Sequence, residues 1–467
     1  MMRFANYGLI YFLPISIALV ESFFSLGLFF FFIKRGTIFF SRIKEQRPAS
    51  WYKKIEIFLT SFKPVSNFLN YPIGFYILVG FLSIIVSKYP FLSIKGFFFK
   101  LLEGTFLYFI FVECFSEKKQ FRTFIYVFFA SSVLIVSSGF FQHFTGIDFI
   151  RQHVNSNDRI TSAFAHPNDF AAYLLVVCAI FFGTSFLGTN RQGSLLIWRW
   201  SPIQIVSCIS FVLALICLGL TYSRGAWIAF FLSILFLGFV NWRVLPISIS
   251  VILIFLFVFF PGMTDNRNIV WLTENTLVII PENIRVKSQM DSPSKSLPPV
   301  QKNDLSSEEI GKEKEKTEEI KVQSAFDLIK KFNASGRQIL WKDAIDIIRQ
   351  NPFGTGLNTY SRIAHEHNMF WSGYPHNCYL QLTAEMGFIG FFVFVWIMVT
   401  LLKKSFENLR HIQDTFFRPI ILGLLAGVLG FLMHSFVDTN FYSVQLSNLM
   451  WAVMGMIVAA QKVTLKT

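Results

Sequence analysis

Runs of about 20 consecutive apolar residues recur along this chain, and they constrain its fold more than any other feature. A run of that length matches an α-helix that crosses the hydrocarbon core of a bilayer. The composition agrees, because 53% of the residues are hydrophobic and only 15% are charged, whereas soluble proteins have about 25% charged residues. The runs are continuous and do not alternate, which excludes a β-barrel. The sequence therefore predicts an all-α, polytopic transmembrane helical bundle.

Hydropathy places eleven candidate spans, give or take one. They cover residues 8–33, 71–87, 96–115, 122–141, 168–187, 202–220, 226–240, 244–260, 379–402, 418–437 and 442–461. Loops rich in Lys and Arg lie on the cytoplasmic side, so the basic segment 34–63 is expected there, together with the C-terminus. The N-terminus is then expected outside, unless the long first stretch is two segments. The net charge of +14 fits this orientation rule and is not taken as a sign of nucleic-acid binding.

The spans divide the chain into three expected parts. An N-terminal bundle of about eight spans covers residues 1–260, a large outer loop covers 261–378, and a C-terminal bundle of about three spans covers 379–467. The middle of the loop, about 287–324, is rich in Lys, Glu, Ser and Pro and predicts a disordered linker. Its flanks "SAFDLIKKF" and "GRQILWKDAIDIIRQNPFG" have helical spacing. They predict small helices on the membrane surface, near the headgroups.

Polar residues next to a bilayer are costly, so the polar clusters on the predicted outer side are candidates for function. "TYSRGAW" places Arg224 in a very short loop, where it could bind phosphate or anchor the helix to lipid headgroups. "GYPHNCYLQLTAEMG" places His376 at the membrane boundary, where it could be a general base. It could equally be part of a helix start capped by Asn377. Glu385 is expected to be a buried partner two turns further in.

Two more clusters are weaker. In "RITSAFAHPNDFAAYL", Asn168 and Asp169 predict an N-cap, while Arg159 and His166 could line an outer cavity. The "HEH" at 365–367 does not have the spacing of a known metal site, so neither a metal nor another cofactor is expected.

Together these motifs resemble the O-antigen ligase and polymerase family of bacterial inner-membrane glycan transferases. The resemblance rests on "SRGAW", a long outer loop, "RQILWKDAIDIIRQNPFGTGLNTY" and "PHNCYLQLTAEMGFIG", in that order. It covers about residues 155–240 and 335–395. It implies a multi-pass inner-membrane enzyme that takes a glycan from undecaprenyl diphosphate on the periplasmic side. The charged linker at about 287–324 departs from the family pattern and resembles an insertion.

The resemblance also implies roles for individual residues. The essential arginine of the family's short loop corresponds to Arg224, its essential histidine to His376, and the arginine of its large-loop helix to Arg337. Arg224, helped by Arg337 or Arg159, would bind the diphosphate and offset charge as the sugar departs. His376 would accept the proton of the attacking hydroxyl, in an inverting reaction without metal. Three supporting residues are expected: Tyr222, Asn377 and Glu385.

The motifs leave the branch of the family open. The leading hypothesis is a ligase, which would use the sugar core of lipid A as acceptor. An O-antigen or exopolysaccharide polymerase would instead join lipid-linked repeat units, and a third branch glycosylates proteins. A transporter or flippase without covalent chemistry is the alternative from another class. Against it, the polar clusters gather on one face, whereas a transporter exposes a path from both sides. Lys100 and Glu103 in the third span are a reservation, although they are expected to pair with each other.

Overall fold

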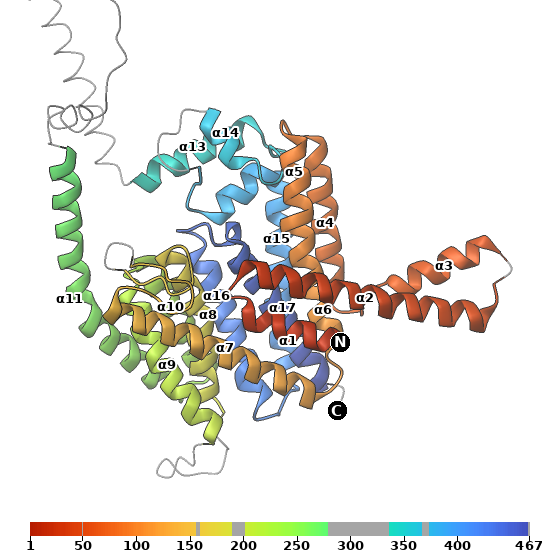
Figure 1. Cartoon of the computed structure of the whole chain (residues 1–467), viewed down its shortest axis with the longest axis horizontal. Coiled ribbons are helices and arrows are strands. Elements are labelled where there is room, and N and C mark those ends of the chain that lie inside the picture. Colours follow the sequence, from red (N-terminus) through yellow and green to blue (C-terminus); the bar gives the residue numbers. More distant parts are fainter. Residues whose placement is uncertain (49, 156–158, 189–200, 279–335, 367–372, 466–467) are drawn as a thin grey trace, which may run out of the picture. The chain divides into compact units, whose positions relative to one another are not determined.

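The computed structural model describes residues 1–48, 50–155, 159–188, 201–278, 336–366 and 373–465. These residues form helices and no named strand. The chain divides into two compact units, Met1–Phe255 with Leu340–Thr467, and Leu256–Ile339. The first unit contains most of the helices in Figure 1, and it is described by itself below.

Among the described residues, seven helices are long and apolar enough to cross a membrane. They are α2 (Ile17–Gln46), α7 (Lys118–Thr145), α8 (Pro167–Phe186), α9 (Pro202–Leu220), α15 (Cys378–Leu409), α16 (Phe417–His434) and α17 (Val444–Leu465). Shorter apolar helices are α4 (Asn70–Ile85), α10 (Arg224–Val240) and α11 (Leu245–Val278), the last of which is apolar over Leu245–Pro261. The remaining elements are α1 (Met2–Phe12), α3 (Trp51–Phe62), α5 (Pro90–Gly96), η1 (Phe97–Leu102), α6 (Glu103–Cys114), α13 (Gly336–Gln350), α14 (Tyr360–Glu366) and η3 (Asn440–Tyr442).

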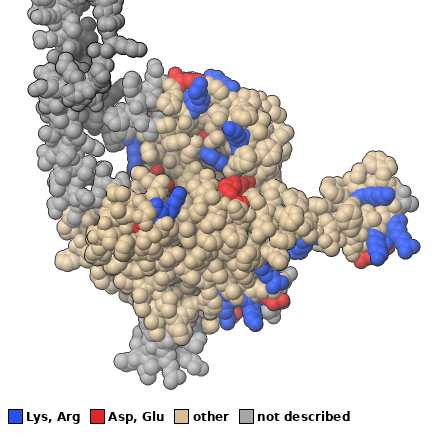
Figure 2. All heavy atoms as spheres, viewed as in Figure 1, with Lys and Arg blue, Asp and Glu red and all other residues tan. Residues whose placement is uncertain are grey.

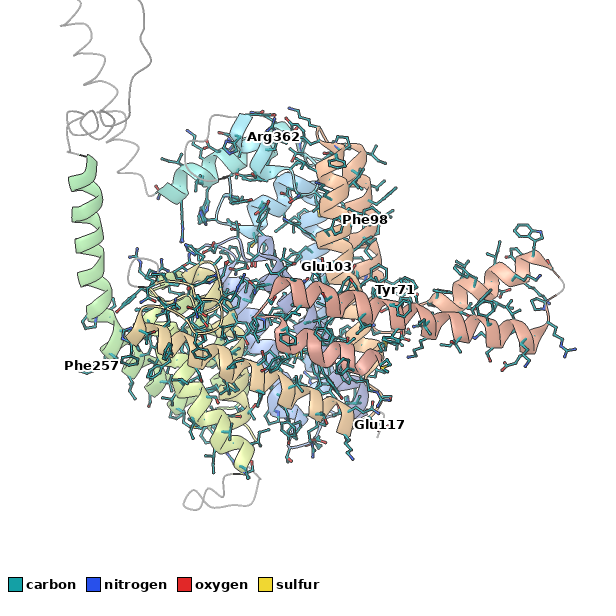
Figure 3. The ribbon with its side chains drawn as sticks, viewed as in Figure 1. Tyr71, Phe98, Glu103, Glu117, Phe257 and Arg362 are labelled. Atoms are coloured by element: carbon teal, nitrogen blue, oxygen red, sulfur yellow. The ribbon has the colours of Figure 1, made fainter. Side chains whose placement is uncertain are left out.

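The outward faces of this bundle carry large apolar side chains. Tyr71 at the start of α4 is 82% exposed and Phe98 in η1 is 54% exposed, and both are labelled in Figure 3. Such surfaces are unfavourable in water and favourable against lipid. The protein is therefore a polytopic all-α membrane protein, which confirms the predicted fold class.

The first predicted span, 8–33, is two helices and not one. The chain turns between α1 and α2 at Leu13–Ser16, where Pro14 interrupts the run. The two helices are antiparallel, because Gly8 faces Phe23 while Gly27 faces Ala5. The N-terminus thus returns toward the part of α2 that precedes the basic segment, which is the alternative that the sequence left open for a first stretch made of two segments.

The third predicted span, 96–115, is built from α5, the π-helical turn η1, and α6. Lys100 and Glu103 do not pair with each other. Lys100 Nζ donates to Asn358 Oδ1 at 2.8 Å, and Glu103 Oε1 accepts from Asn448 Nδ2 at 2.7 Å. Each polar side chain therefore has a partner on another element, and the expected intrahelical pair is wrong.

The centre of the bundle is the antiparallel pair α8 and α16 (Figure 1). Small residues let the two backbones approach closely, as in other membrane helix pairs. A Cβ on Gly423 would lie 2.7 Å from Ile180 Cα, and one on Gly427 would lie 3.1 Å from Val176 Cα. This register brings the start of α8 beside the end of α16.

The helices of the outer loop pack on protein. The apolar side of α13, with Leu340, Ala344 and Ile347, forms a buried cluster with Tyr360 of α14 and Ala384 of α15. The helix over 336–350 was predicted, and its apolar stripe packs on protein, because such a stripe fits a protein partner as well as a lipid surface. Its expected place near the headgroups stays a prediction. "SAFDLIKKF" and the linker at 287–324 lie outside the described residues.

Helix α15 is interrupted at Gly387, whose φ of 69° and ψ of 180° are not helical. Above the break, the carbonyls of Ala384 and Glu385 accept hydrogen bonds from Thr355 N and Gly356 N, both at 2.9 Å. A Cβ on Gly387 would lie 2.5 Å from the carbonyl carbon of Phe353. The loop after α13 is therefore inserted into a break that only glycine fits.

Replacing Gly387 with Ala tests this joint. The φ and ψ angles are in a region that is nearly exclusive to glycine, so we expect the free energy of unfolding to fall by at least about 1–3 kcal/mol, together with faster hydrogen exchange over 352–360. The matched control is Gly74→Ala in α4, where a Cβ meets nothing within 4 Å. Thermal unfolding of the purified protein should be unchanged or slightly raised in the control. Equal stability of the two variants would contradict the assignment.

Candidate functional site

The turn between α9 and α10 presents Arg224 at one end of the bundle. Only three residues separate the two helices, and the Thr221 hydroxyl and the Trp227 ring N–H both donate to the carbonyl of Leu218, at 2.7 and 3.1 Å. Tyr222 has a φ of 48°, which closes the turn tightly. Arg224 is the first residue of α10 and is exposed, so the turn places a cationic residue at this end of the bundle.

Arg159 fastens this turn to the start of α8. Its Nε donates to the carbonyl of Thr221 at 2.6 Å, and its Nη2 donates to Asn168 Oδ1 at 2.7 Å. Arg159 thus supports the backbone three residues before Arg224.

The N-cap of α8 is His166 and not Asn168 or Asp169. The backbone N–H of Asn168 donates to His166 Nδ1 at 3.2 Å, and Pro167 occupies the first helical position. The predicted cap was two residues late because Pro167 is a good first helical residue. The side chain of Asn168 instead bridges two charged groups. Its Oδ1 accepts from Arg159, and its Nδ2 donates to Asp438 Oδ2 at 2.6 Å.

His376 is paired with Asp438, which follows α16. His376 Nδ1 lies 3.2 Å from Asp438 Oδ1, and the side chains are 35% and 10% exposed. Burial raises the pKa of the Asp438 carboxyl, but the hydrogen bond from His376, the charge of His434 and the Thr439 N–H outweigh it and hold that pKa well below its usual range. Asp438 is therefore a carboxylate that only accepts, so His376 Nδ1 donates to it. The other ring nitrogen, Nε2, is left to accept a proton.

The start of α15 fixes the position of His376. Asn377 is the N-cap, and its side chain accepts from Tyr379 N and Leu380 N at 2.9 and 3.0 Å. Cys378 is tied to the end of α16, because its N–H donates to the carbonyl of Ser435 at 2.9 Å. His376 has a φ of 46°, an uncommon conformation that is enriched at functional sites. Asn377 is thus the cap that the sequence predicted as one alternative.

The Arg224 turn lies against the same end of α16. A Cβ on Gly225 would lie 2.4 Å from Val437 Cγ2 and 3.4 Å from His434 Cδ2. Val437 directly precedes Asp438, the partner of His376. The structure therefore brings together the backbone of the Arg224 turn, the Arg159–Asn168–Asp438 hydrogen bonds and the His376 ring. We refer to these five residues as the motif cluster: Arg159, Asn168, Arg224, His376 and Asp438.

Glu385 supports the outer loop and is not the partner of His376. It is buried, and its carboxylate accepts from the backbone N–H groups of Asn358 at 2.7 Å and Tyr360 at 3.2 Å. Lys100 contributes from the third span, because it donates to the Asn358 side chain and lies 3.5 Å from the Tyr442 ring centroid. The expectation that Glu385 is buried is confirmed, but its partners are two backbone N–H groups and the Gln381 side chain.

Other predicted candidates lie on the helices of the outer loop. Arg337 is exposed near the start of α13 and belongs to the unit Leu256–Ile339. His365 is exposed on α14, and His367 lies outside the described residues. Within the described part of the chain, no three His, Cys, Asp or Glu side chains are grouped so as to hold a metal ion.

Asp438 was missed in the sequence. It stands in "FVDTNF", a very short outer loop between the last two predicted spans. The criterion that selected Arg224, a charge in a tight loop beside the membrane, also applies to Asp438.

The chemistry available to the cluster is anion binding and proton transfer. An exposed guanidinium can hold a phosphate through forked hydrogen bonds. A histidine whose Nδ1–H is held by a carboxylate can accept a proton at Nε2, as in acyl-transfer triads.

Replacing Asp438 with Asn tests the pairing. The amide can donate to Nδ1 and favour the wrong tautomer, and such a change lowers kcat by up to about 10⁴-fold in a Ser-His-Asp triad. We expect a large loss of turnover with little change in KM, measured with the purified protein. Because the pKa of Asp438 is held low, the wild-type carboxylate stays charged above about pH 5, so the loss should persist from about pH 5 to pH 8. Wild-type turnover in the Asn variant would exclude this positioning role.

Comparison with known proteins adds one match. A family model described as O-antigen ligase matches residues 209–395, a range that contains Arg224, Arg337 and His376. Among curated proteins, none matches the chain. Arg159, Asn168 and Asp438 lie outside the matched range, so their place in the cluster comes from the structure alone.

Proposed function

We propose, from the match of residues 209–395 to a family model described as O-antigen ligase, that the protein is a glycosyltransferase that moves a glycan from undecaprenyl diphosphate to an acceptor hydroxyl. The reaction takes place at the periplasmic face of the bacterial inner membrane. The sugar core of lipid A is the proposed acceptor, as in ligases.

The observation that carries the proposal is the hydrogen bond between His376 and Asp438 beside the Arg224 turn. The hydrogen bond orients His376 as a base, and the adjacent turn adds the exposed residue Arg224 as a cation at the same end of the bundle. A lipid diphosphate is a good leaving group, so the protein mainly has to neutralise its charge and remove one proton.

In the proposed reaction, the acceptor oxygen forms a bond to the anomeric carbon of the donor while the bond from that carbon to the diphosphate oxygen breaks. The hydroxyl proton goes to His376 Nε2, and the imidazolium is stabilised by Asp438. The electron pair of the broken bond stays on undecaprenyl diphosphate, whose charge Arg224 offsets. Attack from the face opposite the diphosphate inverts the anomeric centre.

The contacts of Arg159 favour a modified role for it. Its bonds to the Thr221 carbonyl and to Asn168 support a positioning role for the Arg224 turn, in place of direct diphosphate binding. The diphosphate role of Arg337 rests on the resemblance and stays a prediction. Tyr222 supports the site through its backbone, which closes the turn that presents Arg224.

The proposal predicts different losses for three variants. His376→Ala removes the base and should lower glycan transfer by about 10²–10⁴-fold. Arg224→Ala should cost about 10²–10³-fold, and Arg224→Lys should restore only part of it because an ammonium lacks the fork. The matched control is Arg243→Ala, an exposed arginine beyond the other end of α10. Transfer of purified lipid-linked glycan is measured for each variant in detergent.

Normal transfer by His376→Ala would contradict the assignment of His376 as the base. A loss in the Arg243→Ala control equal to that of Arg224→Ala would contradict a specific role for Arg224.

A deletion strain distinguishes the branches of the family. Full-length chains that stay on undecaprenyl diphosphate indicate a ligase, and single repeat units indicate a polymerase. Glycan that stays on the cytoplasmic leaflet of the deletion strain would instead support a flippase.

A further inference from the structure

Helices α2 and α3 form a hairpin that extends away from the rest of the bundle (Figure 1). Its root is fixed by Arg35 of α2, which is buried, forms an ion pair with Glu113 of α6 and donates to the carbonyl of Ser61 at 3.1 Å. Beyond this root, the hairpin has few neighbours in the protein, and most of the residues at 40–60 are exposed. The hairpin is thus anchored to the bundle at its root, while most of its surface is not covered by other parts of the described protein.

The hairpin is strongly basic. Residues 34–63 contain eight Lys and Arg and two Glu, and Figure 2 shows Lys and Arg side chains gathered around its far end. Arg35 and Lys34 both form ion pairs with Glu113, so the other six basic residues give this surface its charge. They are Arg42, Lys44, Arg47, Lys53, Lys54 and Lys63.

Large apolar side chains stand among these basic residues on α3. Trp51 is 73% exposed, Tyr52 68% and Leu59 63%, while Ile57 on the opposite side is buried against α2. Aromatic and aliphatic side chains interleaved with lysines are typical of helices that lie in a membrane interface. A water-facing helix would have no reason to expose them.

A cleft between the two helices concentrates the charge. It has a volume of about 490 Å³ and is lined by three basic side chains, Arg42, Arg47 and Lys53. One acidic side chain, Glu56, and polar groups that include Ser50 and Thr60 complete the lining, so the basic side chains outnumber the carboxylate three to one. Arg42 is held in place across the hairpin, because its Nη1 donates to Thr60 Oγ1 at 3.3 Å. Guanidinium, ammonium and hydroxyl donors around one cleft are the groups that bind phosphate.

We propose that the α2–α3 hairpin docks on an anionic phospholipid surface, with lipid phosphate bound in the cleft and Trp51, Tyr52 and Leu59 inserted among the headgroups. Charge complementarity and position favour this occupant, because α2 continues without a break from a part that is apolar enough to cross a membrane into the hairpin. A phospholipid leaflet next to the end of the apolar part of α2 would offer both phosphate groups and acyl chains to the hairpin. This inference is independent of the proposed glycan transfer.

Hydrogen exchange of the full-length protein in nanodiscs tests the proposal. Peptides covering 51–62 are compared in phosphatidylcholine alone and in phosphatidylcholine with about 30% phosphatidylglycerol. We expect exchange to be at least about tenfold slower with the anionic lipid, since each basic residue near such a surface adds to binding. Salt at about 0.5 M should reduce the difference. Equal exchange in the two lipids would overturn the proposal.

Two variants and one added ligand identify the source of the effect. The triple variant R42Q/R47Q/K53Q should lose the lipid dependence, whereas K403Q/K404Q/R410Q, which removes three exposed charges at the end of α15, should keep it. Retention by the first variant would overturn the cleft as the phosphate site. Inorganic phosphate at about 10 mM in neutral nanodiscs should not slow exchange. If it reproduces the protection, the occupant is a soluble phosphate and the lipid docking is wrong.

Discussion

The close antiparallel approach of α8 and α16 is the constraint on which the rest of the structure depends. Glycines on α16 let its backbone contact that of α8 near Ile180 and Val176, and a membrane helix pair without a hydrophobic driving force relies on such contact. Because the pair is in register, the start of α8 meets the end of α16. Asn168 and Asp438 can then bond although 270 residues separate them.

The motif cluster follows from that meeting point. Helices α10 and α15 begin beside the end of α16, one through the contact of Gly225 with Val437 and the other through Cys378 and Ser435. Arg224 at the start of α10, His376 before α15 and Asp438 after α16 are thus brought together by the packing of α8 on α16. Such an arrangement keeps polar groups at the membrane boundary, where they can be hydrated, and avoids their cost in the hydrocarbon.

The sequence predicted the helices well and their partners poorly. Apolar run length predicted most spans within a few residues, because the bilayer imposes that length. It could not separate α1 from α2, since the turn at Pro14 is short and apolar. Arg224 and His376 were selected as polar residues beside spans. Asp438 meets the same criterion and was overlooked, and only the fold shows its contact with His376. Glu385 was predicted as buried and was given the wrong partner for the same reason: spacing along a helix does not say which loop folds back onto it.

The break in α15 divides that helix into two mechanically separate pieces. The short piece that begins at Cys378 leads directly from His376 and is braced by the loop at 354–360 through Glu385, whereas the long piece after Gly387 runs on with the bundle. Changes in the length or composition of the outer loop are therefore absorbed at a hinge-like joint before they reach the hydrophobic interior. Substitutions above this joint need not repack the helices below it.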